Sequence, residues 1–209
     1  MSTLAAYLSE LPLVAILRGI RPNEAVAIGQ ALFDTGFRII EVPLNSPEPL
    51  QSITNLAAAF SGQALIGAGT VLSPEAVDQV AAANGRLIVM PHGAASVIRR
   101  AKAKGLYCLP GVATPTEAFA ALAAGADGLK MFPGESLPPA AVKAWRAVLP
   151  PTLALFPVGG ITTDGMAPYC ASGATGFGLG SALYKPGMTA GEVSQRAQAF
   201  VAAWRRIGT

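Results

Sequence analysis

Gly128-Leu129-Lys130-Met131-Phe132-Pro133 is a short apolar run with one ammonium group inside it, and such a run is typical of a buried strand. Further apolar runs of similar length occur along the 209 residues, and successive runs begin 19 to 26 residues apart. The eight runs cover residues 13–18, 38–44, 64–71, 87–91, 106–112, 128–133, 153–159 and 175–183. The stretches between them have helical spacing. Buried strands that alternate with helices predict an α/β fold with a parallel sheet, closed into a (β/α)8 TIM barrel.

An open, doubly wound sheet is the alternative architecture. It is disfavoured because the first strand-to-helix turn, residues 18–22, reads Arg-Gly-Ile-Arg-Pro and lacks the Gly-x-Gly-x-x-Gly pattern. No linker or low-complexity segment divides the chain. We therefore predict a single domain over residues 1–209, with an extra N-terminal helix over residues 2–9.

Helix boundaries are marked by hydroxyl and glycine residues. Helices are predicted to start at Ser46-Pro47, Ser73-Pro74 and Thr114-Pro115, where a capping hydroxyl precedes a first-turn proline. Thr114 and Glu117 also have the spacing of a capping box. Helix ends are predicted at the glycines that precede the next apolar run, namely Gly36, Gly85, Gly105, Gly125 and Gly173.

The composition excludes several classes of protein. Only 13% of the residues are charged, and the net charge of +3 is not gathered into a basic stripe, so nucleic-acid binding is not expected. No apolar run approaches the ~18 residues of a membrane span. A single histidine, His92, excludes zinc sites that need two or three histidines. Cys108 and Cys170 lack metal-type spacing and are interpreted as buried thiols of a cytoplasmic protein without a signal peptide.

Lys130 is the candidate nucleophile. A lysine is rarely buried without a partner or a chemical task, and burial favours the neutral amine, which can form a Schiff base with a ketone. An ion pair of purely structural purpose with Glu41 is the alternative interpretation of this residue. What favours catalysis is that several polar residues occur together at the carboxyl ends of the predicted strands, where barrels place their active sites.

Each of these residues offers a complementary group. Glu41 lies within an apolar strand, so its pKa should be raised towards an acid/base range. Arg18 follows the first strand and suits a substrate carboxylate, which Thr70 could also bind. Backbone N–H groups after the last two strands suit a phosphate, and these turns contain Gly159, Gly160, Gly180 and Ser181.

The chain resembles the bacterial 2-keto-3-deoxy-6-phosphogluconate and 2-keto-3-deoxy-6-phosphogalactonate aldolases, which are class I enzymes. The most specific segments are residues 40–47 (Ile-Glu-Val-Pro-Leu-Asn-Ser-Pro) and 128–133. Residues 16–19, 66–72, 109–111 and 158–161 extend the resemblance over nearly the whole chain. It implies Lys130 as the Schiff-base lysine, Glu41 as the acid/base, no metal or other cofactor, and a homotrimer.

The resemblance also implies the substrate, a phosphorylated keto-deoxy sugar acid cleaved to pyruvate and glyceraldehyde 3-phosphate. The galactonate branch is favoured because gluconate enzymes typically read Glu-Val-Thr-Leu-Arg-Thr at residues 41–46 and carry threonine at Val158. Val158 is therefore assigned to specificity. Pro91 is assigned to it as well, while His92 departs from the smaller polar residue expected there. A gluconate-type or dual-epimer aldolase and a non-catalytic phosphosugar-binding barrel are the alternatives.

Overall fold

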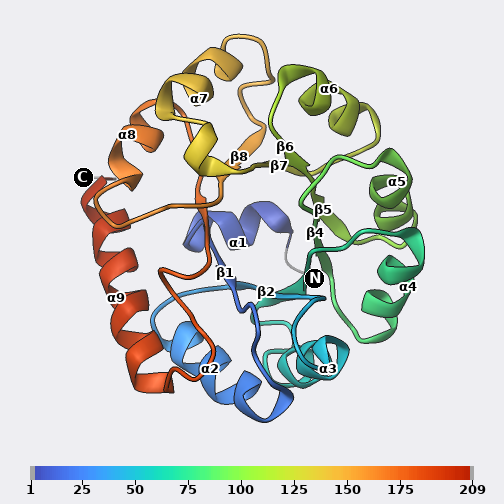
Figure 1. The fold of residues 1–209 in the computed structure, drawn as a ribbon, viewed down its shortest axis with the longest axis vertical. Helices are drawn as coiled ribbons and strands as arrows, with labels where there is room; N and C mark the ends of the chain where they lie inside the picture. The colour runs from blue at the N-terminus through green and yellow to red at the C-terminus, as the bar shows by residue number, and fades with distance from the viewer. Residues whose placement is uncertain (1–2, 208–209) are drawn as a thin grey trace.

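A computed structural model describes residues 3–207. Its strands lie near the centre, and the helices surround them (Figure 1). The strands are β1 (Leu13–Ile16), β2 (Ile39–Pro43), β3 (Leu65–Gly69), β4 (Leu87–Val89), β5 (Tyr107–Leu109), β6 (Gly111–Val112), β7 (Gly128–Met131), β8 (Ala154–Pro157) and β9 (Phe177–Leu179). Every predicted apolar run contains at least one of them.

The helices alternate with these strands, as predicted. They are α1 (Leu4–Glu10), α2 (Pro22–Asp34), α3 (Pro49–Ala59), α4 (Pro74–Ala82), α5 (Ala95–Ala103), α6 (Pro115–Ala123), the 3-10 helix η1 (Gly134–Ser136), α7 (Pro139–Arg146), α8 (Met166–Ala171) and α9 (Ala190–Ile207). Within the described residues, none of them has both the length and the apolar character that crossing a membrane requires.

All strand pairs are parallel, which confirms the predicted α/β class. The strands form a six-stranded sheet in the order β5-β4-β3-β2-β1-β9 and a three-stranded sheet in the order β6-β7-β8. The apolar run 106–112 gives two strands, one on each side of Pro110, because proline has no N–H to donate to a ladder. The carbonyl of Pro110 still accepts a hydrogen bond from the Lys130 amide (2.9 Å).

The core has two apolar layers, one between the strands and the surrounding helices and one enclosed by the strands. Both faces of the strands are buried, which is why their sequences are continuously apolar rather than alternating. The enclosed layer includes Leu4 and Tyr7 of α1, the helix that lies across the middle of the ring in Figure 1. The predicted extra N-terminal helix is thus confirmed over residues 4–10, whereas Ser2 lies outside the described residues.

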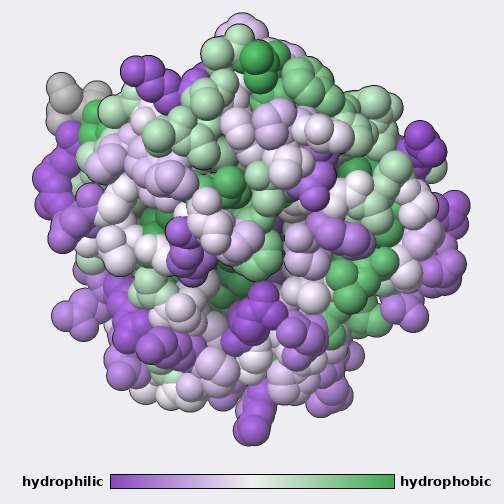
Figure 2. Space-filling model, turned by 45° about the horizontal axis from the view of Figure 1, so that its top comes forward, coloured by the Kyte–Doolittle hydropathy of each residue, from purple (hydrophilic) through white to green (hydrophobic). Residues whose placement is uncertain are grey.

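Most of the large apolar side chains are buried in these two layers. The face drawn in Figure 2 mixes hydrophilic and hydrophobic residues. The exposed large hydrophobic side chains come from separate elements, for example Leu72 after β3, Phe119 in α6 and Val148 after α7.

Two of the three predicted helix starts are confirmed. Ser73 and Thr114 cap α4 and α6, and Thr114 forms the predicted capping box with Glu117. The prediction at Ser46 is wrong, since α3 begins at Pro49 after Glu48 in a left-handed conformation (φ 42°). The Ser46 hydroxyl instead accepts a hydrogen bond from the Gly19 amide, 27 residues away, and a tertiary contact has thus replaced the local cap.

Helix ends follow the glycine prediction with one exception. Gly36, Gly105, Gly125 and Gly173 all have positive φ angles, the conformation that favours glycine at a helix end. At the end of α4 the left-handed residue is Asn84 (φ 62°) rather than Gly85, which places the turn one residue earlier than predicted. Asparagine is among the few residues other than glycine that tolerate this conformation.

Candidate active site

One cavity brings most of the predicted site residues together. Its volume is about 260 Å³, and it opens beyond the carboxyl ends of β1, β7, β8 and β9. Its walls contain seven residues predicted from the sequence, namely Arg18, Lys130, Val158, Gly159, Gly160, Gly180 and Ser181. Phe132, Thr162 and Ala182 also line it, although nothing in their residue types distinguished them in the sequence.

Lys130 lies on β7 and is only 6% exposed. Its ammonium nitrogen stands 4.4 Å from the centre of the Phe132 ring. Burial lowers the pKa of the lysine; the negative charge of Glu41 opposes this shift, and the positive charge of Arg18 adds to it. The environment therefore increases the fraction of neutral, nucleophilic amine at a given pH.

Glu41 lies on β2 and is 1% exposed. It shares with Lys130 a small cavity of about 10 Å³, which is enclosed by the strands. Burial raises the pKa of its carboxyl group to about 7, and Lys130, Arg18 and the backbone N–H of Gly69 moderate the rise. Among the described residues Oε2 has no hydrogen-bond partner. A carboxyl group with a pKa near neutrality can both take up and release a proton under physiological conditions.

Because Gly69 has no side chain, the Glu41 carboxylate can occupy the space beside it. A Cβ atom added at position 69 would overlap the carboxylate oxygens, although the glycine backbone there is not left-handed. We expect Gly69→Ala to lower kcat/KM by about tenfold or more, because a misplaced proton-transfer group loses much of its catalytic effect. Gly191→Ala is the matched control, since its Cβ would meet nothing closer than 3.9 Å. Full activity in the Gly69 variant would show that the carboxylate position is unimportant.

Arg18 follows β1 at the rim of the cavity and is exposed. One of its guanidinium nitrogens, Nη1, donates to Oδ1 of Asn45 (2.9 Å). Asn45 was recognised in the sequence only as part of a family pattern. Its contact with Arg18 depends on how the turns after β1 and β2 meet.

Three predicted site residues lie outside the walls of the 260 Å³ cavity, namely Glu41, Thr70 and Pro91, and so does His92. Thr70 follows β3, is half-buried and has a left-handed backbone (φ 57°), which is strained for a β-branched residue. Pro91 is half-buried after β4, and His92 is exposed next to it.

The turn after β8 owes its shape to two glycines. Gly159 and Gly160 have φ angles of 111° and 66°. A Cβ atom on either would also lie within 3 Å of the Glu135 side chain. Two successive residues must therefore be glycine for the backbone to form this part of the cavity wall.

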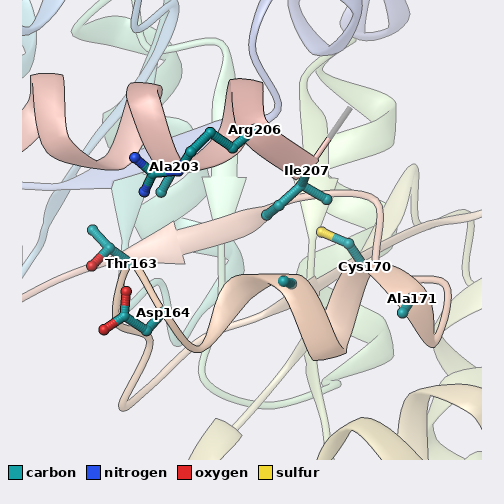
Figure 3. Close-up of a pocket in the computed structure, with 8 residues that line it drawn as sticks. Thr163, Asp164, Cys170, Ala171, Ala203, Arg206 and Ile207 are labelled. Carbon is teal, nitrogen blue, oxygen red and sulfur yellow. The ribbon is translucent and has the colours of Figure 1, made fainter. Parts of the chain in front are cut away.

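A larger cavity of about 650 Å³ lies between α8 and the end of α9 (Figure 3). Thr163, Asp164, Cys170 and Arg206 are among the residues that line it, and it shares no residue with the cavity of Lys130. The thiol of Cys170 has its pKa raised by burial, so it is not an activated nucleophile. A third cavity, of about 800 Å³, is larger still. Size alone would therefore not select the cavity of Lys130, but the complementary groups lie there. Within residues 3–207 no three His, Cys, Asp or Glu side chains gather into a possible metal site.

Comparison with known proteins gives a consistent result. The family model of KDPG and KHG aldolases matches residues 4–199. A probable 2-dehydro-3-deoxy-6-phosphogalactonate aldolase of Rhizobium meliloti (strain 1021) is 52% identical over 95% of this chain and 93% of its own. The 2-dehydro-3-deoxy-6-phosphogalactonate aldolase of Escherichia coli (strain K12) is 50% identical over 94% and 96%. A solved structure described as native KDPGal superposes with a TM-score of 0.94, at 49% identity over 95% of this chain and 97% of that one.

Proposed function

The chain belongs to the KDPG and KHG aldolase family, and we propose that it is a class I aldolase cleaving 2-dehydro-3-deoxy-6-phosphogalactonate to pyruvate and D-glyceraldehyde 3-phosphate. The substrate follows from the relatives that are about half identical over almost the whole chain. The observation that carries the chemistry is the buried Lys130 amine in a cavity with Arg18, with the Glu41 carboxyl group beside it.

In the proposed reaction the neutral Lys130 amine attacks the C2 ketone and forms a carbinolamine. Loss of water gives a protonated imine, with Glu41 moving the protons. The Glu41 carboxylate then takes the C4 hydroxyl proton, and the C3–C4 bond breaks. Its electron pair moves to the iminium and leaves an enamine, while glyceraldehyde 3-phosphate departs. Glu41 returns the proton to C3, and water hydrolyses the imine to pyruvate and free Lys130.

The anionic ends of the substrate have separate partners in this proposal. Arg18 and Thr70 bind the carboxylate, and the turns that contain Gly159, Gly160, Gly180 and Ser181 bind the phosphate. Arg18 and these turns line the same cavity as Lys130, which supports the assignment. The strained backbone of Thr70 is also typical of a position under functional constraint.

We propose further that the two sheets belong to one (β/α)8 barrel in a single domain over residues 1–209. One feature of the chain and two contacts support this: β5 and β6 are separated only by Pro110, Val158 pairs with Gly178, and the Thr175 amide donates to the Leu155 carbonyl (2.9 Å). A cytoplasmic homotrimer remains a prediction from the resemblance, and sedimentation of the purified protein tests its oligomeric part.

Reductive trapping tests the proposed chemistry. Borohydride in the presence of pyruvate should reduce the imine to a stable adduct that peptide mass analysis locates at Lys130. Borohydride without pyruvate is the control and should leave the protein unchanged. Absence of an adduct, or an adduct on another lysine, would overturn the assignment. Substrate binding without turnover or adduct would favour the phosphosugar-binding barrel instead.

Val158 tests the preference for the galactonate epimer. Its apolar side chain is buried and lines both the substrate cavity and the small cavity beside Glu41. We expect Val158→Thr to shift the ratio of kcat/KM for the two C4 epimers towards the gluconate by about fivefold or more, because a hydroxyl in the site can bond a differently placed substrate hydroxyl. Val158→Ile is the apolar control. An unchanged ratio in the threonine variant would remove Val158 from the specificity determinants.

A further inference from the structure

The segment after β2 holds the turn after β1 through two side-chain contacts. Nη1 of Arg18 donates to Oδ1 of Asn45, and the amide of Gly19 donates to Oγ of Ser46, both at 2.9 Å. Just before them, the Leu17 amide donates to the Glu41 carbonyl (3.0 Å). The strand that carries Glu41 is therefore directly joined to the turn that carries Arg18.

Both sides of this turn are tightly constrained. Ser46 is buried, and its own amide donates to the Pro43 carbonyl (2.9 Å), which holds the residue in a short turn. Gly19 is left-handed (φ 82°), and a Cβ atom there would lie 2.7 Å from the Pro186 ring. The Arg18 backbone thus has little freedom, and the remaining freedom lies in its long side chain.

The partner of that side chain is electrically neutral. Among the described residues the ion pairs involve other side chains, and no carboxylate pairs with Arg18. The Asn45 amide oxygen accepts a hydrogen bond from the guanidinium without cancelling its charge, and a guanidinium has further N–H donors that can face an anion. The charge acts on both titratable groups nearby, since Arg18 helps to lower the pKa of Lys130 and also lowers that of Glu41, whose own negative charge raises the pKa of Lys130.

We propose that Asn45 is a positioning residue that holds the Arg18 guanidinium at the rim of the cavity for an anionic substrate, while Ser46 holds the turn beneath it. The inference rests on the proposed function, because its readout is aldol cleavage. It adds a role for Asn45 that depends on charge neutrality as well as on hydrogen bonding. Asparagine meets both requirements, and aspartate meets only the second.

The test compares Asn45→Ala and Asn45→Asp in the whole protein. Both variants should raise KM about fivefold to tenfold while kcat changes about twofold or less, because one charge-assisted contact with the substrate is weakened. Asn45→Asp should also shift the pH dependence of borohydride trapping with pyruvate to higher pH, since a carboxylate cancels part of the Arg18 charge. Gln63→Glu is the control for added charge. Gln63 is exposed and precedes β3, so it lies at the amino end of a strand, whereas the cavity opens at the carboxyl ends.

A double-mutant cycle shows whether Asn45 acts through Arg18. In an Arg18→Ala background, Asn45→Ala should leave the residual KM unchanged, because the side chain it positions is gone. An equal increase in KM with and without Arg18 would overturn the inference, as would a fall in kcat at constant KM. Failure of the proposed function looks different, since the unmodified protein would then show neither cleavage nor a trapped adduct.

Discussion

Replacing Lys130 by methionine is expected to lower aldol cleavage by about 10⁴-fold or more, because no other route to the imine remains once the nucleophile is removed. Methionine has a similar length and suits the apolar surroundings of Lys130, which is 6% exposed. Turnover of the galactonate substrate and borohydride trapping with pyruvate measure the effect. Both should be lost together.

The fold should survive this change. Replacement of a buried charge by an apolar side chain of similar size is often neutral or stabilising, so the Tm of Lys130→Met should be equal to or above that of the unmodified protein. Lys143→Met, at an exposed position in α7, is the matched control and should keep full activity. Substantial turnover in the folded Lys130 variant would exclude the Schiff-base mechanism.

Replacing Glu41 by glutamine is expected to lower kcat by about 10² to 10⁴-fold, the usual contribution of a positioned acid or base. The amine of Lys130 is untouched, so the adduct with pyruvate should still form. Glu75→Gln, at an exposed position in α4, is the control. Loss of trapping together with turnover would show that imine formation itself requires Glu41, and unchanged kcat would remove it from the mechanism.

The pH profile gives an independent measurement of the same residue. Burial raises the pKa of Glu41 from 4.5 to about 7. Because the ionised form is the base, kcat/KM should rise with pH through about 7 in the unmodified protein, and this rising limb should be absent in Glu41→Gln.

The stability of the folded protein should change with pH in the opposite sense. Because the carboxyl pKa is raised in the folded state, Glu41 adds up to about 3 kcal/mol to the free energy of unfolding at pH values below 4.5. This contribution is lost as the pH rises through 7.

Much of the fold was predictable from local patterns. Strands that are buried on both faces have continuous apolar sequences, so each of them could be located, and the caps at Ser73 and Thr114 depend only on neighbouring residues. Ser46 has the same local pattern as Ser73, yet it caps no helix. Its hydroxyl bonds Gly19 instead, and no pattern within a few residues of Ser46 contains that information.

The sequence by itself determined which residues end strands. Parallel strands have their carboxyl ends at one edge, so the chemistry of Lys130, Glu41 and Arg18 could be inferred from their order along the chain. Only the tertiary structure decided which of these ends share a cavity. It placed Lys130 and Arg18 in one cavity wall, left Thr70 outside it and brought Asn45 against Arg18. The reason is physical: contacts between turns 27 residues apart depend on how the strands curve and pack, which the local sequence does not specify.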